Sequence, residues 1–245
     1  MQQLIRNVMV VGPGTMGRGI AKTFARGGHD VTVLSRHPAK VAPFEGAVSV
    51  TDELPKDAPD FIIESIVEEM DAKHALFERI EAAYGGGPIL ATNTSGLPMT
   101  DMAVRLKHPE RFIGVHYLQP ADALPLVEVI RVETTTDTVL DAIKAALGRN
   151  GQKALVLNKP VPGFLLNRLQ HAMMHEALAM IEDGVCSAAD VDACLKGALA
   201  PRMCLTGLIE QKDLSGLQVT AATHRNLVPD MHQGQGGRAL RCGSE

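Results

Sequence analysis

A histidine and a glutamate twelve positions apart have the residue types of an acid–base pair. His116 ends the apolar run FIGVH, and Glu128 lies inside a second apolar run, LVEVI. Histidine titrates near neutral pH, so it suits the removal and return of a hydroxyl proton. A carboxylate buried in a strand needs a polar partner, and one bonded to the far ring nitrogen of His116 would fix its tautomer. The alternative for Glu128 is a surface position on an edge strand.

A glycine-rich loop has the spacing of a dinucleotide-binding turn. Gly12, Gly14 and Gly17 form GxGxxG directly after the apolar run VMVV and at the start of a helical pattern. The first glycine permits a tight turn, the second lets a pyrophosphate approach the backbone, and the third allows close helix–strand packing. Thr15 and Met16 would lie at the helix N-terminus, whose free N–H groups attract phosphate. The loop therefore predicts a bound dinucleotide, with a purely structural turn as the alternative.

The end of the next apolar run bears on which dinucleotide binds. An acidic residue is expected there, because a carboxylate accepts hydrogen bonds from a free ribose 2′-OH and repels a 2′-phosphate. This chain has Ser35 and Arg36 instead. Arginine pairs well with phosphate, so the sequence favours NADP(H) over NAD(H). The alternative is an exposed arginine beside an unselective ribose pocket.

The elements that must position these residues alternate between strand and helix. Strands are predicted at 7–11, 30–34, 61–66, 89–92, 112–116, 126–130 and 154–157, and helices at 16–26, 71–84 and 137–148. This alternation predicts an α/β fold with a Rossmann-type, doubly wound, mostly parallel sheet. His116 would then lie at the carboxyl end of a strand, where such sheets bind ligands.

The pattern changes after the segment NKPVPG at 158–163. Residues 164–183 have the pattern of one long helix, and two or three more helices follow without a convincing strand. We expect a dinucleotide-binding domain at 1–157, an all-helical substrate and dimerisation domain at 158–230, and a flexible tail at 231–245. So small a helical domain buries little surface by itself, which favours a homodimer.

Composition argues against several classes of partner. The formal net charge is -4, and Lys and Arg form no block, so we expect neither nucleic acid nor an anionic membrane surface as a partner. Without a long apolar run or a signal-peptide pattern, a cytoplasmic location is expected. The four cysteines have neither zinc-site nor CxxC spacing, and His171 and His175 lack a third ligand, so no metal site is expected.

Four more segments complete a recognisable order. They are ESIVEEMDAK (64–73), NTSGL (93–97), RFIGVHYLQPADALPLVEVI (111–130) and PGFLLNRL (162–169). Together with the glycine loop, they make residues 5–228 resemble the 3-hydroxyacyl-CoA dehydrogenase family. The resemblance implies interconversion of an L-3-hydroxy acid and its 3-oxo counterpart, with His116 as the base and Glu128 as its partner.

The resemblance also assigns roles to further residues. Ser95 and Asn167 would hold the reacting oxygen, while Glu68, Lys73 and Gln119 would line the cofactor. Each has a simpler alternative: Ser95 as a helix N-cap, Asn167 as a polar residue in mid-helix, and the long side chains of Glu68 and Lys73 as solvated groups. Gln119 replaces the family's usual asparagine, which alters that contact.

Two departures from the family bear on the substrate. The long helical arm that contacts coenzyme A is largely missing after the second strand, and the chain has less helix near its end than family members normally carry. We therefore expect a substrate without coenzyme A, a free 3-hydroxy acid or its 3-oxo counterpart. The alternatives are a 3-hydroxyacyl-CoA dehydrogenase proper and a non-catalytic, crystallin-like dinucleotide-binding relative. A β-hydroxyacid dehydrogenase is disfavoured, because Lys159, Lys196 and Lys212 lack a matching context for its catalytic lysine.

Overall fold

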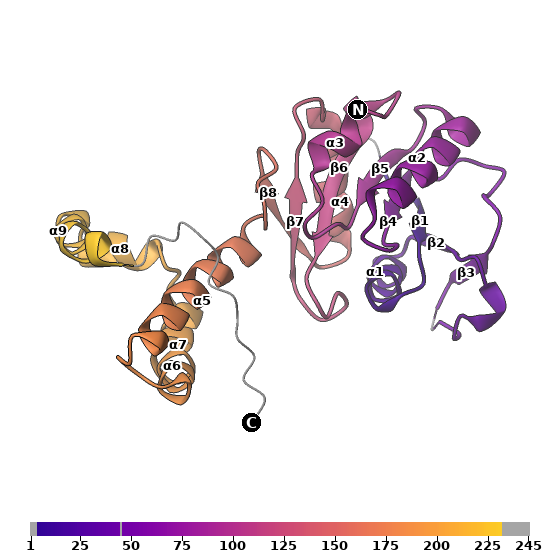
Figure 1. Ribbon diagram of the computed structural model, residues 1–245. Helices are drawn as coiled ribbons and strands as arrows, with labels where there is room; N and C mark the ends of the chain where they lie inside the picture. Colours follow the sequence, from indigo (N-terminus) through magenta and orange to yellow (C-terminus); the bar gives the residue numbers. More distant parts are fainter. Residues whose placement is uncertain (1–3, 45, 232–245) are drawn as a thin grey trace. The chain divides into compact units, whose positions relative to one another are not determined.

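The computed structural model describes residues 4–44 and 46–231, and the chain forms two compact units, Met1–Leu166 and Asn167–Glu245 (Figure 1). The division falls after Leu166 and not after residue 157, because Leu165 and Leu166 donate backbone hydrogen bonds to Glu128 in the first unit. The predicted tail, 231–245, lies outside the described residues except for Met231.

The first unit is built on one eight-stranded sheet with the order β3-β2-β1-β4-β5-β6-β7-β8. Its strands are β1 (Asn7–Val11), β2 (Asp30–Leu34), β3 (Val48–Thr51), β4 (Phe61–Glu64), β5 (Ile89–Thr92), β6 (Phe112–Tyr117), β7 (Leu126–Ile130) and β8 (Lys153–Leu157). All neighbours are parallel except β6 and β7, which are antiparallel. The predicted mostly parallel α/β fold is therefore confirmed.

Helices cover both faces of this sheet (Figure 1). They are α1 (Thr15–Arg26), α2 (Met70–Tyr84), α3 (Met99–Ala103) and α4 (Asp137–Arg149). Apolar side chains of α1 and α4 share one core with Val8 and Val10 of β1, whereas those of α2 and α3 share a second core with Met9 and Val11. Because alternate residues of a strand point to opposite faces, β1 contributes to both cores, as the doubly wound arrangement requires.

Two expected elements end or begin differently. The strand expected at 61–66 ends at Glu64, whose carboxylate accepts the Ile66 N–H as the chain leaves the sheet. The helix expected at 164–183 is α5 (Leu166–Glu182). It cannot start at Phe164, because Gly163 (φ +75°) and Phe164 (φ +46°) both have left-handed backbone conformations.

Within residues 167–231, the second unit contains helices joined by turns and no strand. After α5 come α6 (Ala188–Cys194), a π-helical turn (Leu195–Leu199), α7 (Ala200–Leu205), α8 (Glu210–Ser215), α9 (Leu217–Leu227) and a 3₁₀ turn (Val228–Asp230). Of its described residues, only Ala179 is buried. No helix in the described ranges is long and apolar enough to span a membrane.

Candidate active site

The glycine loop joins β1 to α1, and each glycine has a different environment. Gly12 has φ +104°, and a Cβ there would lie 2.4 Å from the Ser65 carbonyl oxygen. A Cβ on Gly17 would lie 1.9 Å from the Gly12 carbonyl oxygen, so α1 packs on the turn only because residue 17 has no side chain. A Cβ on Gly14 would meet nothing within 4 Å. The open position at the start of α1 is therefore Gly14, as a closely approaching pyrophosphate requires.

A cavity of about 700 Å³ opens beside this loop at the carboxyl ends of β1 and β2. Gly12, Gly14, Ser35 and Arg36 line it, together with apolar residues of α2. Ser35 is buried and Arg36 is exposed. The lining also contains Arg79 and Asp52, two charged residues that the sequence did not single out. Their positions became apparent only once α2 and the end of β3 were placed against the loop.

A second cavity, of about 300 Å³, lies at the other side of the α1 N-terminus. Thr15, Met16 and Gln119 line it, although Gln119 is more than a hundred positions away in sequence. Seven of the ten residues predicted to hold the cofactor thus line one of two cavities near the start of α1, whereas Gly17, Glu68 and Lys73 line neither. A nicotinamide dinucleotide has two ends joined by a pyrophosphate, so two cavities that include Gly14 and the adjacent Thr15, respectively, fit such a molecule.

His116 and Glu128 form a buried hydrogen-bonded pair. His116 Nδ1 lies 2.7 Å from Glu128 Oε2, and the two residues are direct partners in the antiparallel register of β6 and β7. The His116 side chain is 7% exposed and that of Glu128 is 0% exposed. Glu128 is therefore not an edge-strand surface residue, because β7 lies between β6 and β8.

The second oxygen of Glu128 holds the chain that leads to α5. Glu128 Oε1 accepts hydrogen bonds from the Leu165 N–H at 2.8 Å and the Leu166 N–H at 2.9 Å. These donors lie at the first turn of a helix, where free N–H groups stabilise negative charge. Phe164, just before them, packs its ring against that of His116, with centroids 5.2 Å apart. The His116–Glu128 pair is thus fixed both by the sheet and by this segment.

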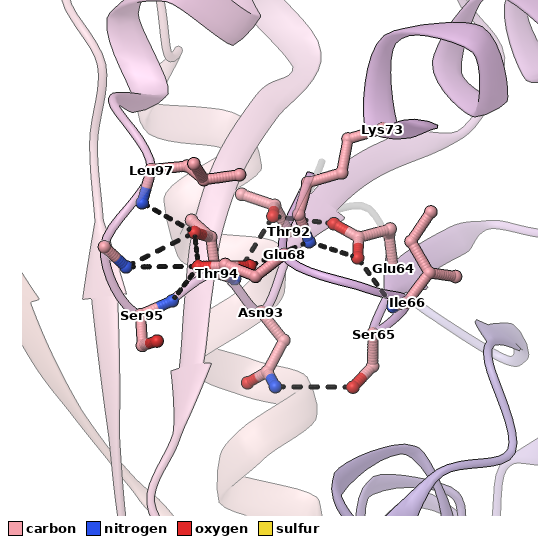
Figure 2. Close-up of polar contacts among 11 residues, drawn as sticks. Glu64, Ser65, Ile66, Glu68, Lys73, Thr92, Asn93, Thr94, Ser95 and Leu97 are labelled. Atoms are coloured by element: carbon pink, nitrogen blue, oxygen red, sulfur yellow. Dashed lines mark hydrogen bonds and ion pairs between the residues drawn. The ribbon is translucent and has the colours of Figure 1, made fainter. Parts of the chain in front are cut away.

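Ser95 belongs to a tight loop after β5, residues 93–97, which we call the Ser95 loop. Glu68 Oε1 accepts the N–H groups of Ser95 and Gly96 at 3.0 and 3.2 Å, and also the Thr94 hydroxyl (Figure 2). Burial by itself would raise the pKa of Glu68, but the Thr94 hydrogen bond, the Lys73 charge and the Ser95 N–H together lower it. Ser95 is not a helix N-cap, since α3 begins at Met99 after Pro98.

Lys73 is buried, and the sequence-based alternative of a solvated side chain is wrong for it. Its Nζ lies 2.5 Å from Glu64 Oε1 and 3.2 Å from Glu68 Oε2, and its side chain is 1% exposed. Glu64 also accepts the Thr92 hydroxyl at 2.8 Å. Sequence reasoning missed Glu64, although an acidic residue ending the apolar strand FIIE was a usable signal.

Asn167 is the first residue of the second unit and the second residue of α5, so it lies in the first helical turn and not in mid-helix. Its role at the substrate stays a prediction. Ser95, His116 and Glu128 all belong to the first unit. Within the described ranges, no group of three or more His, Cys, Asp or Glu side chains could hold a metal ion.

Comparison with known proteins places both units in one family. The 3-hydroxyacyl-CoA dehydrogenase NAD binding domain matches residues 7–56 and 41–160, and the C-terminal domain of the same family matches residues 163–242. A 3-hydroxybutyryl-CoA dehydrogenase of Clostridioides difficile is 33% identical, over 87% of this chain and 84% of the relative. An L-carnitine dehydrogenase of Streptomyces griseus is also 33% identical, over 78% of this chain and 64% of the relative.

One relative matches in both sequence and structure. The 5-formyl-3-hydroxy-2-methylpyridine 4-carboxylate 5-dehydrogenase of Mesorhizobium japonicum is 29% identical over 93% of this chain and 82% of the relative. A crystal structure of an enzyme of that name, described as an NAD⁺-dependent dismutase, matches with a TM-score of 0.88 at 28% identity, covering 96% of this chain and 84% of the other. The first unit is therefore a nicotinamide dinucleotide-binding domain, and the chain belongs to the 3-hydroxyacyl-CoA dehydrogenase family of oxidoreductases.

Proposed function

We propose that this protein transfers hydride between a nicotinamide cofactor and C3 of a 3-hydroxy acid or its 3-oxo counterpart, with His116 as the general acid and base. The observation that carries the proposal is the 2.7 Å contact between His116 Nδ1 and the buried Glu128 carboxylate at the carboxyl end of β6. An ionised carboxylate can only accept hydrogen bonds, so Glu128 binds the Nδ1 proton. The lone pair of Nε2 is then left for the substrate hydroxyl.

In the proposed oxidation, the substrate loses one proton and one hydride, and in the reduction it regains both. In oxidation, His116 Nε2 takes the hydroxyl proton as the C3 hydrogen departs with its electron pair and the carbon–oxygen double bond forms. The nicotinamide ring supplies the hydride acceptor. Glu128 stabilises the resulting imidazolium, and the reverse reaction returns the proton from Nε2 to the oxygen. Ser95 and Asn167 would donate hydrogen bonds to that oxygen, where negative charge develops during reduction.

We propose that the substrate lacks coenzyme A. Between β2 and β4, the described residues contain only a 3₁₀ turn (Pro38–Lys40) and β3, so the family's helical arm is not in this part of the chain. The family match also divides within 41–56, in this same connection. Two relatives are named for substrates without coenzyme A, a pyridine carboxylate and L-carnitine. These observations favour a free 3-hydroxy or 3-oxo acid over its thioester.

We propose NADP(H) as the preferred cofactor, held at its 2′-phosphate by Arg36. Two arginines, Arg36 and Arg79, line the cavity beside Gly14, and no ion pair of either is found among the described residues. Asp52 is the one carboxylate of that lining. NAD(H) is the alternative, with Asp52 accepting from the ribose hydroxyls, and the NAD⁺ dependence of the structural relative favours it.

We also propose a homodimer formed through the helical unit. Large apolar side chains of that unit are exposed, among them Leu205, Ile209, Leu214 and Leu217. A homodimer would cover such side chains. Light scattering after size-exclusion chromatography should give twice the 26.2 kDa chain mass, and a monomer at micromolar concentration would contradict it.

The test of the function begins with titration of NADPH and NADH into the purified protein, followed by nicotinamide fluorescence. The preferred cofactor is then used to screen free 3-oxo acids and acetoacetyl-CoA. Turnover of a free acid supports the proposal. Turnover of acetoacetyl-CoA alone identifies a 3-hydroxyacyl-CoA dehydrogenase proper, and tight cofactor binding without any turnover identifies a non-catalytic relative.

A further inference from the structure

One carboxylate accepts three hydrogen bonds from the Ser95 loop. Glu68 Oε1 accepts the N–H groups of Ser95 and Gly96, together with the Thr94 hydroxyl. Thr94 in turn accepts the Leu97 N–H at 3.0 Å. In Figure 2 the side-chain oxygen of Ser95 points away from Glu68. The loop is thus fixed through its backbone, which leaves the Ser95 hydroxyl available to a ligand.

The position of Glu68 depends in turn on Lys73. Glu68 is 41% exposed at its side chain and leaves from a turn before α2, so packing alone does not fix it. Its Oε2 lies 3.2 Å from Lys73 Nζ, and Lys73 is enclosed. Because the ammonium group already lies between two carboxylates, its charge is balanced by this chain's own residues before any cofactor arrives.

Glu64 connects this ion pair to the sheet. It ends β4, is 0% exposed, and accepts hydrogen bonds from Lys73, from the Ile66 N–H at 2.7 Å and from Thr92 at the end of β5. Each of its oxygens therefore has a partner on a rigid element. A buried carboxylate so bonded is a fixed point from which other side chains can be oriented.

We infer that Glu64 and Lys73 are positioning residues: the buried chain Glu64–Lys73–Glu68, which we call the relay, sets the place of the Ser95 loop beside His116. The other side of the loop is already tied to β6, because Asn93 Oδ1 accepts the Tyr117 N–H at 2.8 Å. The relay holds the part of the loop that carries Ser95, through the N–H groups of Ser95 and Gly96. This inference rests on the proposed role of Ser95 at the substrate.

The relay differs from the role that family resemblance gives to Glu68 and Lys73, which is direct contact with the cofactor. In the relay, the effect of Lys73 reaches the reaction through Glu68 and the Ser95 backbone. Loss of Glu64 should therefore alter substrate turnover and loop order while leaving cofactor affinity unchanged. If these residues act by direct contact with the cofactor, the same loss should weaken cofactor affinity and leave the order of the loop unchanged.

The test is Glu64→Gln, which keeps the shape of the side chain and removes its charge. Hydrogen–deuterium exchange of the amides of 93–97 should accelerate about tenfold in the variant, because loss of the Glu64 charge removes its ion pair with Lys73, on which the position of Glu68 depends. The KM for the acid substrate should rise, and kcat should fall, with the dissociation constant of the dinucleotide within about twofold of that of the wild type. Glu68→Gln, a less buried change, should accelerate the same amides and covers the case in which Glu64→Gln does not fold.

The matched control is Glu81→Gln. Glu81 lies on α2 and is, like Glu64, a buried carboxylate that accepts backbone N–H groups, in this case those of Lys107 and His108. This variant should accelerate exchange at 107–108 and leave 93–97 and turnover unchanged. Unchanged exchange at 93–97 in both relay variants would overturn the inference, and so would a loss of dinucleotide affinity with the loop still protected. Because exchange needs no substrate, failure of the relay and failure of the proposed dehydrogenase activity remain distinguishable.

Discussion

His116 and Glu128 lie directly opposite one another on the two antiparallel strands of an otherwise parallel sheet, with Nδ1 and Oε2 2.7 Å apart. Cross-strand partners share a face of the sheet, so the geometry of the pair follows from register. The same carboxylate receives two N–H groups from the segment before α5. Both oxygens of Glu128 are thereby committed, which restricts the ring of His116 to one orientation.

Replacing either member of the pair should separate catalysis from cofactor binding. We expect His116→Gln to lower kcat by about two to four orders of magnitude, the range of general acid–base catalysis. Glu128→Gln should lower it at least about 100-fold by disturbing the tautomer. Steady-state kinetics with a free 3-oxo acid measures both. His108→Gln, whose side chain is 42% exposed, is the control. Full activity of His116→Gln would show that His116 is not the general acid and base.

Two glycine substitutions should have opposite effects. Gly14→Ala places its Cβ in open space, so stability should change by less than about 0.5 kcal/mol while dinucleotide affinity falls at least about tenfold. Gly17→Ala places its Cβ 1.9 Å from a backbone oxygen and should destabilise the protein by roughly 1–3 kcal/mol, although alanine is the better helix former. Urea unfolding and NADPH titration measure both quantities. Normal affinity in Gly14→Ala would mean that the pyrophosphate does not approach that residue.

Arg36 should control the choice of dinucleotide. Arg36→Gln removes the charge proposed to bind the 2′-phosphate, so the dissociation constant of NADPH should rise about tenfold or more, with that of NADH nearly unchanged. Calorimetric titration of 2′,5′-ADP and 5′-AMP measures the contribution of the 2′-phosphate, because the two ligands differ only in that group and neither contains nicotinamide. The exposed Arg105→Gln serves as the control. If Arg36→Gln weakens the binding of both nucleotides equally, Arg36 contacts the part of the ligand that they share. A preference of the wild type for NADH would reject the NADP(H) proposal.

The Ser95 loop should be sensitive to acid. The pKa of Glu68 is lowered in the folded protein, so its ionised form contributes stability above its ordinary pKa of about 4.5. That contribution is lost as the pH falls from there through the lowered pKa, because the folded state then has to bind a proton it disfavours. Glu68→Gln should accordingly lose less stability than the wild type as the pH falls below 4.5. Thermal melts across that range provide the measurement, and parallel pH dependence in the two proteins would contradict it.

Much of the fold was predictable because its strands are short apolar runs separated by helical periodicity. β3 was missed because VSVT is a half-buried edge strand with only four residues. The antiparallel direction of β7 was not predicted either, since a buried strand has the same apolar pattern in both directions. Residues 118–125 could have shown it, because parallel neighbours need a crossover of a dozen or more residues.

Some contacts of the candidate site could likewise be predicted from the sequence, whereas others depend on how separate elements pack. His116 and Glu128 could be paired from the sequence, because a carboxylate inside an apolar strand requires a partner and both residues lie on predicted strands. Glu64 and Thr94 could not be joined to Ser95, since their contacts depend on how the ends of β4, β5 and α2 meet in space. Arg79 was missed for a similar reason. Only the packing of α2 against the glycine loop brings it to the cavity of Arg36.

The antiparallel pairing of β6 and β7 also bears on how the protein folds. Its partners are closer in sequence than those of any other strand pair in the sheet, with His116 and Glu128 separated by 12 positions. Closing a short loop costs less chain entropy, so we expect this hairpin to form before the long-range pairing of β1 with β4. Pulse-labelled amide exchange should then show protection in 113–117 and 127–130 ahead of β1, and simultaneous protection would argue against this order. On this order, His116 and Glu128 are brought together by the most local strand pairing in the sheet, and the nucleotide-binding turn is completed later.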